Sequence, residues 1–269
     1  MTQPLKLPKF DNPPLVAVAL GIEFEPLERW GIPHFGLFWG QIKNKYPHCL
    51  IKPPLASQLE VFGEAERQFT MTFGAPPEVR GWFNNKQQTW LIQLQRERFV
   101  VNWRKIPVDG DYPRFQKFLA RFEEEWDQFR NFVRDNDLGN LKPLQCELNY
   151  FNHIELPDGW RETELLKDYL PCWTGKTSGD FLPVPEVVAI NTSYTLPDDQ
   201  GRLHISMQPV FRHTDAKEVI QLTVTARVLI ADDDHVAMQK AIQIAHEWGV
   251  NGFTDFTSSQ MHSQWGRRP

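Results

Sequence analysis

The feature that most restricts the fold of this chain is a run of apolar residues at helical spacing between residues 115 and 133. They recur every three or four positions and are mostly aromatic: Phe115, Phe118, Leu119, Phe122, Trp126, Phe129 and Val133. The opposite side carries charges of both signs, with Arg121 and Glu125 four positions apart. This spacing predicts an amphipathic helix of about six turns, with Asp111 as cap and Pro113 in the first turn, that buries one face against another layer.

The layer beneath this helix is predicted to be an antiparallel sheet. Apolar and polar residues alternate strictly from Leu15 to Glu25, which is typical of a half-buried strand. A short aromatic helix is expected from Pro33 to Tyr46. Further strands are expected at 69–73, 79–83, 89–94, 99–103 and 144–150. Because the connections between them are short, the strands should form a meander.

A similar plan follows more briefly toward the C-terminus. Strands are predicted at 187–194, 203–207 and 219–230, and the last of these alternates without exception. A helix should begin at the aspartate run 232–234 and end at Gly249.

The two regions are separated by residues 156–185, which are rich in proline and glycine and show little periodicity. We therefore expect an α+β protein with two antiparallel β-meanders, each packed against a helix, in a two-lobed chain. The N-terminal lobe would span 1–155, the junction 156–185 and the C-terminal lobe 186–269, with two sheets and a cleft or interface between the lobes.

Composition narrows the class of protein. The chain has 269 residues and a net charge of −5, which argues against a protein held on DNA by bulk charge. No run of about 20 apolar residues suggests a membrane span, and the N-terminus lacks the apolar core of a secretory signal. Cys49, Cys146 and Cys172 are odd in number and lack CxxC spacing, so we expect neither disulfides nor zinc, and a cytoplasmic location. Cys146 should be a buried strand residue.

Three motifs suggest chemistry but are incomplete. Residues 175–178 resemble the end of a phosphate-binding loop, but Leu170 stands where its first glycine is needed. His246 and the glutamate after it begin an HExxH pattern, but position 250 is Val250, so His246 is expected near a helix C-terminus. The aspartates at 232–234 are expected to cap a helix. We therefore identify no catalytic residue and expect no metal and no cofactor.

One set of residues is compatible with binding. Around 96–105 the alternation places Phe99, Val101 and Trp103 on one face and polar residues on the other. If the helix covers the first face, the open face carries arginines, amides and a tryptophan, which could bind single-stranded nucleic acid or a nucleotide. The other interpretation is a solvated face, which Glu23 and Glu25 would share, with the tryptophan covered by the second lobe. The candidate binding residues here are Arg80, Trp82, Arg98, Asn102 and Arg104.

The C-terminal residues 251–268 are rich in aromatic and polar side chains. Ser258 or Thr257 could cap a last short helix that lays Met261 and Trp265 on the body of the protein. Alternatively this stretch lines a cleft between the lobes, and His262 and Trp265 are therefore further candidate binding residues.

The ends of the chain resemble a known family. The N-terminal pattern from Asn12 to Leu27 reads NPPLV, then GI, F and PL, and the C-terminal pattern from Phe253 to Gly266 reads FxxFTxxxMHxxWG. Both are similar to a sporadically distributed family of bacterial and archaeal proteins of roughly this length and of unknown function. The resemblance implies no catalytic residue. Its sporadic distribution implies horizontal transfer, and a mobile-element, toxin–antitoxin or phage-defence setting would fit it.

These observations favour a binding or interaction protein over an enzyme. The expected partner is another protein, encoded by a neighbouring gene. The alternative is an RNA or nucleotide binder, or a metal-independent nuclease that uses a histidine with Arg98 or Arg104. A third possibility is a pocket for a small ligand.

Overall fold

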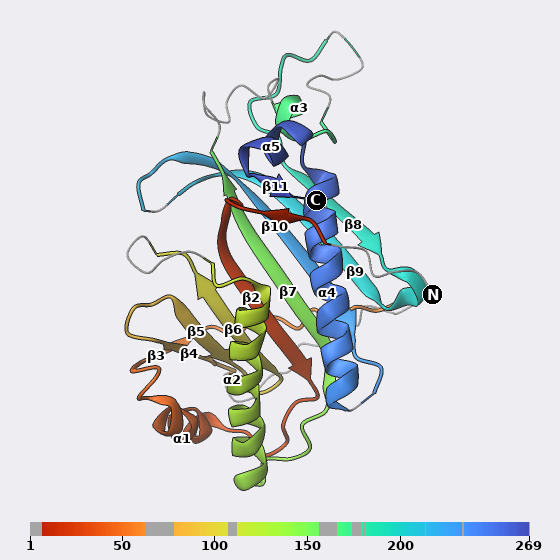
Figure 1. The fold of residues 1–269 in the computed structure, drawn as a ribbon. Helices are drawn as coiled ribbons and strands as arrows, with labels where there is room; N and C mark the ends of the chain where they lie inside the picture. Colours follow the sequence, from red (N-terminus) through yellow and green to blue (C-terminus); the bar gives the residue numbers. More distant parts are fainter. Residues whose placement is uncertain are drawn as a thin grey trace.

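The computed structural model describes residues 7–62, 78–106, 112–155, 166–173, 179, 181–212, 214–232 and 234–268. Nine strands form one antiparallel sheet in the order β3-β4-β5-β6-β2-β7-β10-β9-β8, and β1 pairs with β11 in a small second sheet (Figure 1). The α+β class with meander strands is therefore confirmed. The two meanders join in one continuous sheet, however, so the expectation of two separate large sheets with a cleft between them is wrong.

The strands of the first part of the chain are β1 (Lys9–Phe10), β2 (Leu15–Phe24), β3 (His48–Lys52), β4 (Arg80–Asn84), β5 (Trp90–Leu94) and β6 (Arg98–Arg104). The later strands are β7 (Pro143–Ile154), β8 (Ile190–Thr195), β9 (Gly201–Phe211), β10 (Glu218–Leu229) and β11 (Arg267–Arg268). The helices are α1 (Ile32–Ile42), α2 (Phe115–Asp135), α3 (Leu166–Tyr169), α4 (His235–Phe256) and α5 (Ser259–Gln264), and a 3-10 turn spans Pro197–Asp199.

The large sheet consists of two halves with similar topology. From the centre outward, the first half contains β2, β6, β5, β4 and β3, and the second contains β7, β10, β9 and β8. β2 and β7 pair in antiparallel fashion at the centre, with Leu20 opposite Leu148. In each half a long helix, α2 or α4, follows the strand next to the central one. The two halves thus share the same order of elements around the centre of the sheet, and β7 begins the second half. The division into lobes at 156–185 stays a prediction.

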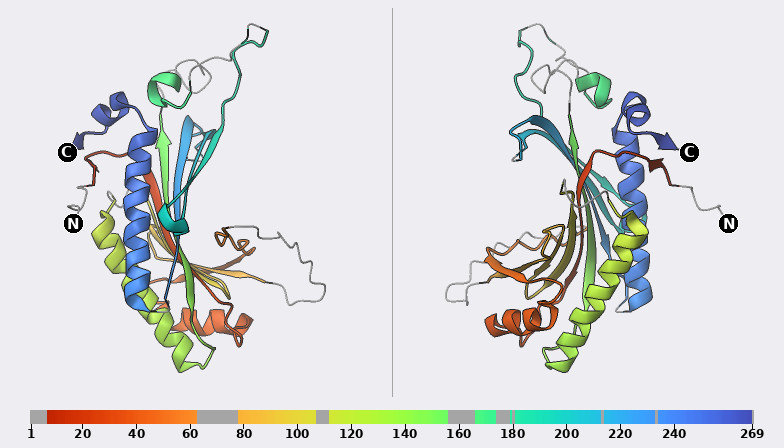
Figure 2. Two further views of the ribbon diagram at one scale, coloured as in Figure 1. Left: turned by 90° about the vertical axis from the view of Figure 1, so that its right-hand side faces the viewer. Right: turned by 60° about the vertical axis from the view of Figure 1, so that its left-hand side comes forward.

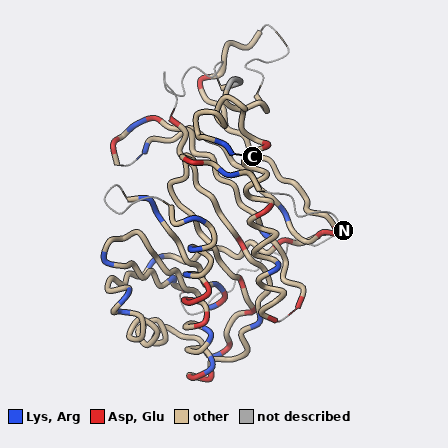
Figure 3. The backbone as a smooth tube through the Cα atoms, viewed as in Figure 1, with Lys and Arg blue, Asp and Glu red and all other residues tan. Residues whose placement is uncertain are grey.

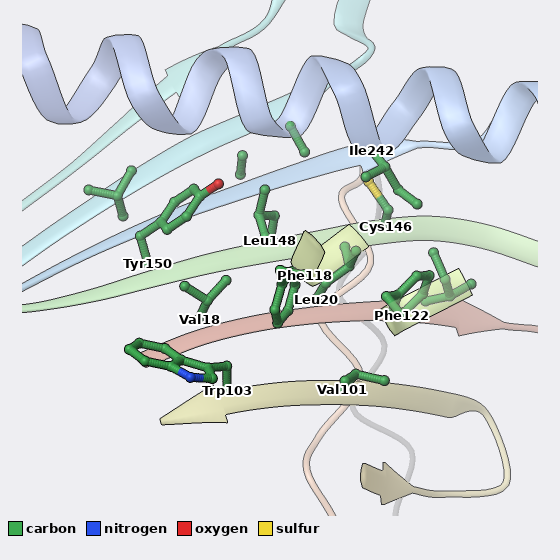
Figure 4. Packing of buried hydrophobic residues seen from close by; sticks show 14 of the residues in the cluster. Val18, Leu20, Val101, Trp103, Phe118, Phe122, Cys146, Leu148, Tyr150 and Ile242 are labelled. Atoms are coloured by element: carbon green, nitrogen blue, oxygen red, sulfur yellow. The ribbon is translucent and has the colours of Figure 1, made fainter. Parts of the chain in front are cut away.

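Helices α2 and α4 lie side by side on the same side of the sheet (Figure 2). The apolar residues of the central strands point toward these helices, as Figure 4 shows for Val18 and Leu20 of β2 and for Leu148 of β7. Helix α1 packs on the same layer, since the Phe38 ring contacts Phe129 of α2 at 5.7 Å between centroids. Burial of this face is expected to be the main stabilising contribution to the fold.

Helix α4 is longer than predicted. It continues through Gly249 and Gly252 and ends at Phe256. A Cβ atom on Gly249 would lie 2.9 Å from the Tyr150 ring, and one on Gly252 would lie 2.4 Å from Leu203. These glycines therefore allow the helix to approach the sheet closely, so the prediction that Gly249 ends the helix is wrong.

The helix starts were predicted with mixed success. Asp234 caps α4, since its side chain accepts a hydrogen bond from the Ala237 amide at 2.6 Å. Ser258 caps α5 in the same way, and Met261 is buried as expected. Helix α2 begins after Arg114, whose φ of 72° lies in the left-handed region, so Pro113 precedes the helix and its expected place in the first turn is wrong. The Arg114 side chain does not cap the helix.

Some predicted features lie outside the described residues: the strand at 69–73, Asp111 and the sequence at 175–178. Within the described residues, no helix is long and apolar enough to cross a membrane.

Candidate functional site

The face of the large sheet opposite α2 and α4, here called the open face, is polar along most of its width. The alternation predicted for β6 is confirmed, because Phe99, Val101 and Trp103 are buried under α2. Five of the seven candidate residues belong to β4 and β6, with their side chains at the alternate positions: Arg80, Trp82, Arg98, Asn102 and Arg104.

At the centre of the open face, Arg98 forms a buried ion pair with Glu23 of β2. The Arg98 Nη2 atom lies 2.6 Å from Glu23 Oε2, and the two residues are only 7% and 5% exposed. Glu23 was expected on a solvated surface, and this is wrong. Removing one partner of such a pair leaves an uncompensated buried charge, so Arg98 has a structural role whatever else it does.

Arg80, Asn102 and Arg104 form two sets of hydrogen bonds on the open face. The Arg80 guanidinium donates to Gln93 at 2.7 Å, and the Gln93 amide donates to Asn102 at 2.7 Å. Arg104 donates to the side chain of Asn84 and to the Gln88 carbonyl, both at 2.9 Å. Partial burial lowers the pKa of both Arg80 and Arg104 from the ordinary arginine value, and both remain cationic. None of the described contacts joins a histidine to Arg98 or Arg104.

Trp82 is half-buried between two cations. The Arg80 guanidinium lies 5.2 Å and the Lys52 ammonium 5.9 Å from its ring centroid. The contact is a cation–π arrangement within the range at which the ring quadrupole attracts a charge. Trp82 is therefore held by its own strand and by β3.

An irregular segment, residues 53–62, crosses the open face. We call it the strap. It follows β3 and lies on the opposite side of the sheet from α4 (Figure 2). Sequence reasoning missed it, because its residues show neither helical nor strand periodicity.

Two glutamine side chains hold the main chain of the strap. Gln95 accepts a hydrogen bond from the Leu55 amide at 2.7 Å and donates to the Leu55 carbonyl at 3.1 Å. Gln145 of β7 accepts from the Glu60 amide at 2.8 Å and donates to the Gln58 carbonyl at 3.2 Å. A primary amide can make this pair of bonds because it offers both a donor and an acceptor, as a neighbouring strand would.

The far end of the strap is held by charge. The Glu60 carboxylate lies among Arg202 and His204 of β9 and Arg227 of β10, with His204 Nε2 at 2.6 Å. Burial raises the pKa of Glu60, but hydrogen bonds from Arg202 and His204 outweigh it and hold that pKa below its ordinary value. Arg227 also donates to Glu147 of β7 at 2.6 Å.

This arrangement balances positive and negative charge on the open face. Glu23, Glu60 and Glu147 each pair with an arginine. Over the chain as a whole, acidic and basic residues are interspersed in the same way (Figure 3). The arginines at the centre of the face are therefore already neutralised, which disfavours extensive binding of phosphate groups there.

The strap presents apolar side chains to solvent. Leu55 and Leu59 are each 39% exposed and Val61 is 54% exposed, whereas the side chain of Glu60 is buried beneath them. Exposed apolar residues on a segment held in place by hydrogen bonds are typical of a surface that contacts another protein.

The remaining two candidate residues lie far from the open face. His262 and Trp265 are buried and contact Phe10 of β1, with ring centroids at 5.6 and 6.3 Å. Trp265 also packs on Phe253 of α4 at 5.3 Å. Docking of the C-terminal segment on the body is thus shown, and a binding role for these two residues stays a prediction.

His246 lies in the middle of α4 because the helix continues past Gly249, so its expected position near a helix end is wrong. Burial lowers the pKa of His246 to about 4, and the imidazole is neutral near pH 7. The sequence signal that could have placed it is the run of small residues Ala241, Ala245 and Gly249 on the same helix, which indicates a face close to the sheet.

Cysteine and metal chemistry receive no support from the geometry. The three cysteines are unpaired, and Cys146 is buried as predicted, with its pKa raised to about 12 by that burial. Within the described ranges, no group of three or more His, Cys, Asp or Glu side chains is placed to hold a metal ion.

Comparison with known proteins adds no functional indication. A scan against protein-family models finds no match, and a search of curated proteins finds none either. The resemblance to a sporadically distributed family therefore stays a prediction.

Proposed function

We propose that this chain is a binding protein whose open face, together with the strap, contacts another protein. The observation that carries the proposal is the combination of fixed main chain and exposed apolar side chains in the strap. Gln95 and Gln145 hold its backbone, while Leu55, Leu59 and Val61 face outward. Ordering a segment costs conformational entropy, so a surface ordered in advance binds a partner with a smaller cost.

The chemistry of the partner follows from this surface. Its contact region should be apolar at the centre, to cover the strap leucines, and polar at the rim, where the partly exposed Arg202 lies. A partner encoded by a neighbouring gene, in the cytoplasm and in a mobile-element, toxin–antitoxin or phage-defence setting, is part of this proposal.

The test is co-expression with the product of each neighbouring gene, followed by size-exclusion chromatography and calorimetric titration of the purified pair. Leu59→Asp combined with Val61→Asp should abolish the complex, because both changes place charge in the apolar contact. Leu37→Asp is the matched control, since Leu37 is 53% exposed but belongs to α1. A complex that survives the strap variant, or a chain that remains alone with every neighbour, contradicts the proposal.

A second variant tests whether the order of the strap matters. Gln145→Leu removes the hydrogen bonds to Gln58 and Glu60 and leaves the outward side chains unchanged. We expect the partner affinity to fall by roughly three- to tenfold, because the strap must then be ordered at the moment of binding. An unchanged affinity would show that the order of the strap in the free protein does not contribute to binding of the partner.

Single-stranded RNA is the second candidate, and Trp82 between Arg80 and Lys52 is the observation that favours it. Base stacking on an aromatic ring beside cations is a common mode of such binding. The combined variant Trp82→Ala and Arg80→Gln should then remove a salt-dependent affinity for an oligouridine. Arg98→Ala is unsuitable as a test, because it leaves Glu23 buried without its partner.

A further inference from the structure

A cavity of about 600 Å³ lies between the two halves on the helix side of the sheet. Its floor is formed by Tyr150 and Asn152 of β7, one wall by the start of α2, and the other wall by α4 from His246 to Phe253. Phe10 of β1 also lines it. The volume is within the range of sites that enclose a small organic molecule.

The interior of the cavity is mostly apolar and aromatic. Phe115 stacks on the His246 ring with centroids 3.5 Å apart and planes 8° apart. Phe10 meets Phe253 edge-on at 5.5 Å, and Val250 adds an aliphatic side chain. Such a lining favours a hydrocarbon or aromatic ligand.

His246 contributes no charge to this interior. Its Nδ1 atom lies 2.7 Å from the Tyr150 hydroxyl, which points from β7 toward α4 (Figure 4). Because its pKa is lowered to about 4, the imidazole offers hydrogen bonding without a positive charge. An anionic group of a ligand therefore gains little at this depth and would bind elsewhere.

The groups that suit an anion gather at the start of α2. The Tyr112 hydroxyl is buried and has no hydrogen-bond partner among the described residues. Two residues later, the exposed Arg114 donates, among the described residues, to the main-chain carbonyls of Phe10 at 2.8 Å and Asp11 at 3.3 Å. Among the described residues, no side chain caps the helix that begins at Phe115, so none of them occupies its first amides or the positive end of its dipole.

The mouth of the cavity has an excess of positive charge. Lys9, Arg114 and Arg268 line it, and Asp11 is the single carboxylate among the described lining residues. Asp11 pairs with Arg268 at 2.9 Å, so it does not neutralise Arg114. A buried hydroxyl without a hydrogen-bond partner is unfavourable, and an acceptor oxygen from a ligand would remove that penalty.

We propose that this cavity binds an apolar monocarboxylate. The hydrocarbon or aromatic body lies among Phe10, Phe115 and Val250, and the carboxylate meets the Tyr112 hydroxyl, the Arg114 guanidinium and the first amides of α2. This site is separate from the open face, which lies on the other side of the sheet, and it does not depend on the proposed protein partner.

The experiment compares decanoate with decanol, which differ only in the head group. Binding is measured by calorimetric titration and by the ligand-induced shift in melting temperature of the full chain. Decanoate should bind at least tenfold more tightly than decanol, because the carboxylate makes charge-assisted hydrogen bonds at the α2 end.

Variants locate the site. Arg114→Gln and Tyr112→Phe should each bring decanoate close to the affinity of decanol and leave decanol unchanged. Val250→Trp should abolish binding of both, since the indole fills the cavity. Arg130→Gln is the matched control and should have no effect, because Arg130 lies on α2 about 22 Å beyond the start of that helix.

Several results would overturn the proposal. Equal affinities for decanoate and decanol in the unchanged protein would remove the carboxylate site. Decanoate binding that persists in Arg114→Gln, Tyr112→Phe and Val250→Trp would place the ligand elsewhere. If decanoate binds only after deletion of residues 1–6, the cavity serves the chain's own N-terminus.

Discussion

The two halves of the sheet are covered by helices of different composition. The buried face of α2 consists mainly of large rings, and that of α4 mainly of small and aliphatic residues. In the first half, the single ring of Phe129 contacts five other aromatic rings, those of Phe24, Trp30, Phe38, Phe99 and Trp126. In the second half, Gly249 and Gly252 allow the helix backbone to rest almost directly on the strands.

This difference shows that one topology can be packed in two ways. The separation of a helix from the layer beneath it depends on the size of the side chains at the contact. Rings between α2 and the sheet hold them apart and interlock, whereas glycine and alanine bring α4 close. The separation between helix and sheet therefore differs between the two halves, and the cavity lies where the halves join.

Phe129→Ala should break the aromatic half. Phe129 is fully buried, and its ring stacks on Phe99 with centroids 5.0 Å apart. We expect a loss of about 3–5 kcal/mol in the free energy of unfolding, because the substitution leaves a cavity that rigid rings cannot fill. Chemical denaturation measures this, with the exposed Arg130→Ala as control. A loss below about 1 kcal/mol would mean that the rings repack freely.

His246 should make the region between the halves sensitive to acid. Its pKa is about 4 in the folded protein and 6.5 when unperturbed. As the pH falls, His246 is therefore protonated in the unfolded chain before it is protonated in the folded protein. The stability that comes from the neutral, buried His246 is complete above pH 6.5 and is lost as the pH falls toward 4. The loss should reach at most about 3 kcal/mol.

The acid effect is measured as the melting temperature of the unchanged protein against that of His246→Phe across this pH range. The variant keeps the ring that stacks on Phe115 and lacks the titrating group. Its curve should fall less steeply, and parallel curves would contradict the prediction.

Gly249→Ala should disturb the close contact of the second half. The new methyl group would lie 2.9 Å from the Tyr150 ring, so the helix or the ring must move. We expect a loss of about 1–3 kcal/mol, despite the better helix propensity of alanine. Gly36→Ala in α1 is the control, since nothing lies within 4 Å of its added methyl group. Equal behaviour of the two variants would show that α4 does not need the close approach.

Ile242→Val should give the smallest change. Ile242 lies on the buried face of α4 and is fully buried, and the substitution removes one methylene group. We expect a loss of about 0.5–1.5 kcal/mol in the free energy of unfolding, measured by the same denaturation. A loss as large as that of Phe129→Ala would remove the contrast between the two halves.

Hydrophobic periodicity predicted the strands and helices that have one buried and one exposed face. The alternation of β2 and β10 and the helical spacing of α2 were sufficient to place these elements, because one face of each is buried along its whole length. Strand β3 was missed, since four of its five residues are exposed and its pattern has no buried face. Gly249 was misread because its role is spatial: it makes room for Tyr150 of another element.

The candidate site shows the same limit. The alternation in β6 placed Arg98 and Asn102 on one face, but it could not reveal that Glu23 lies opposite Arg98, 75 residues earlier in the chain. The strap and the cavity were both missed as particular sites. Each is assembled from segments far apart in the chain, and no local sequence pattern predicts which distant segments come into contact.

The central position of β7 has a consequence for how the chain folds during synthesis. One edge of β7 pairs with β2, which is made long before it, and the other edge pairs with β10, which ends 75 residues after β7 does. While the ribosome makes these residues, β7 is an open edge strand, and such an edge is a template for aggregation. We expect the N-terminal half to be protected only when β10 arrives, so the chain should reach its folded state late and in one cooperative step.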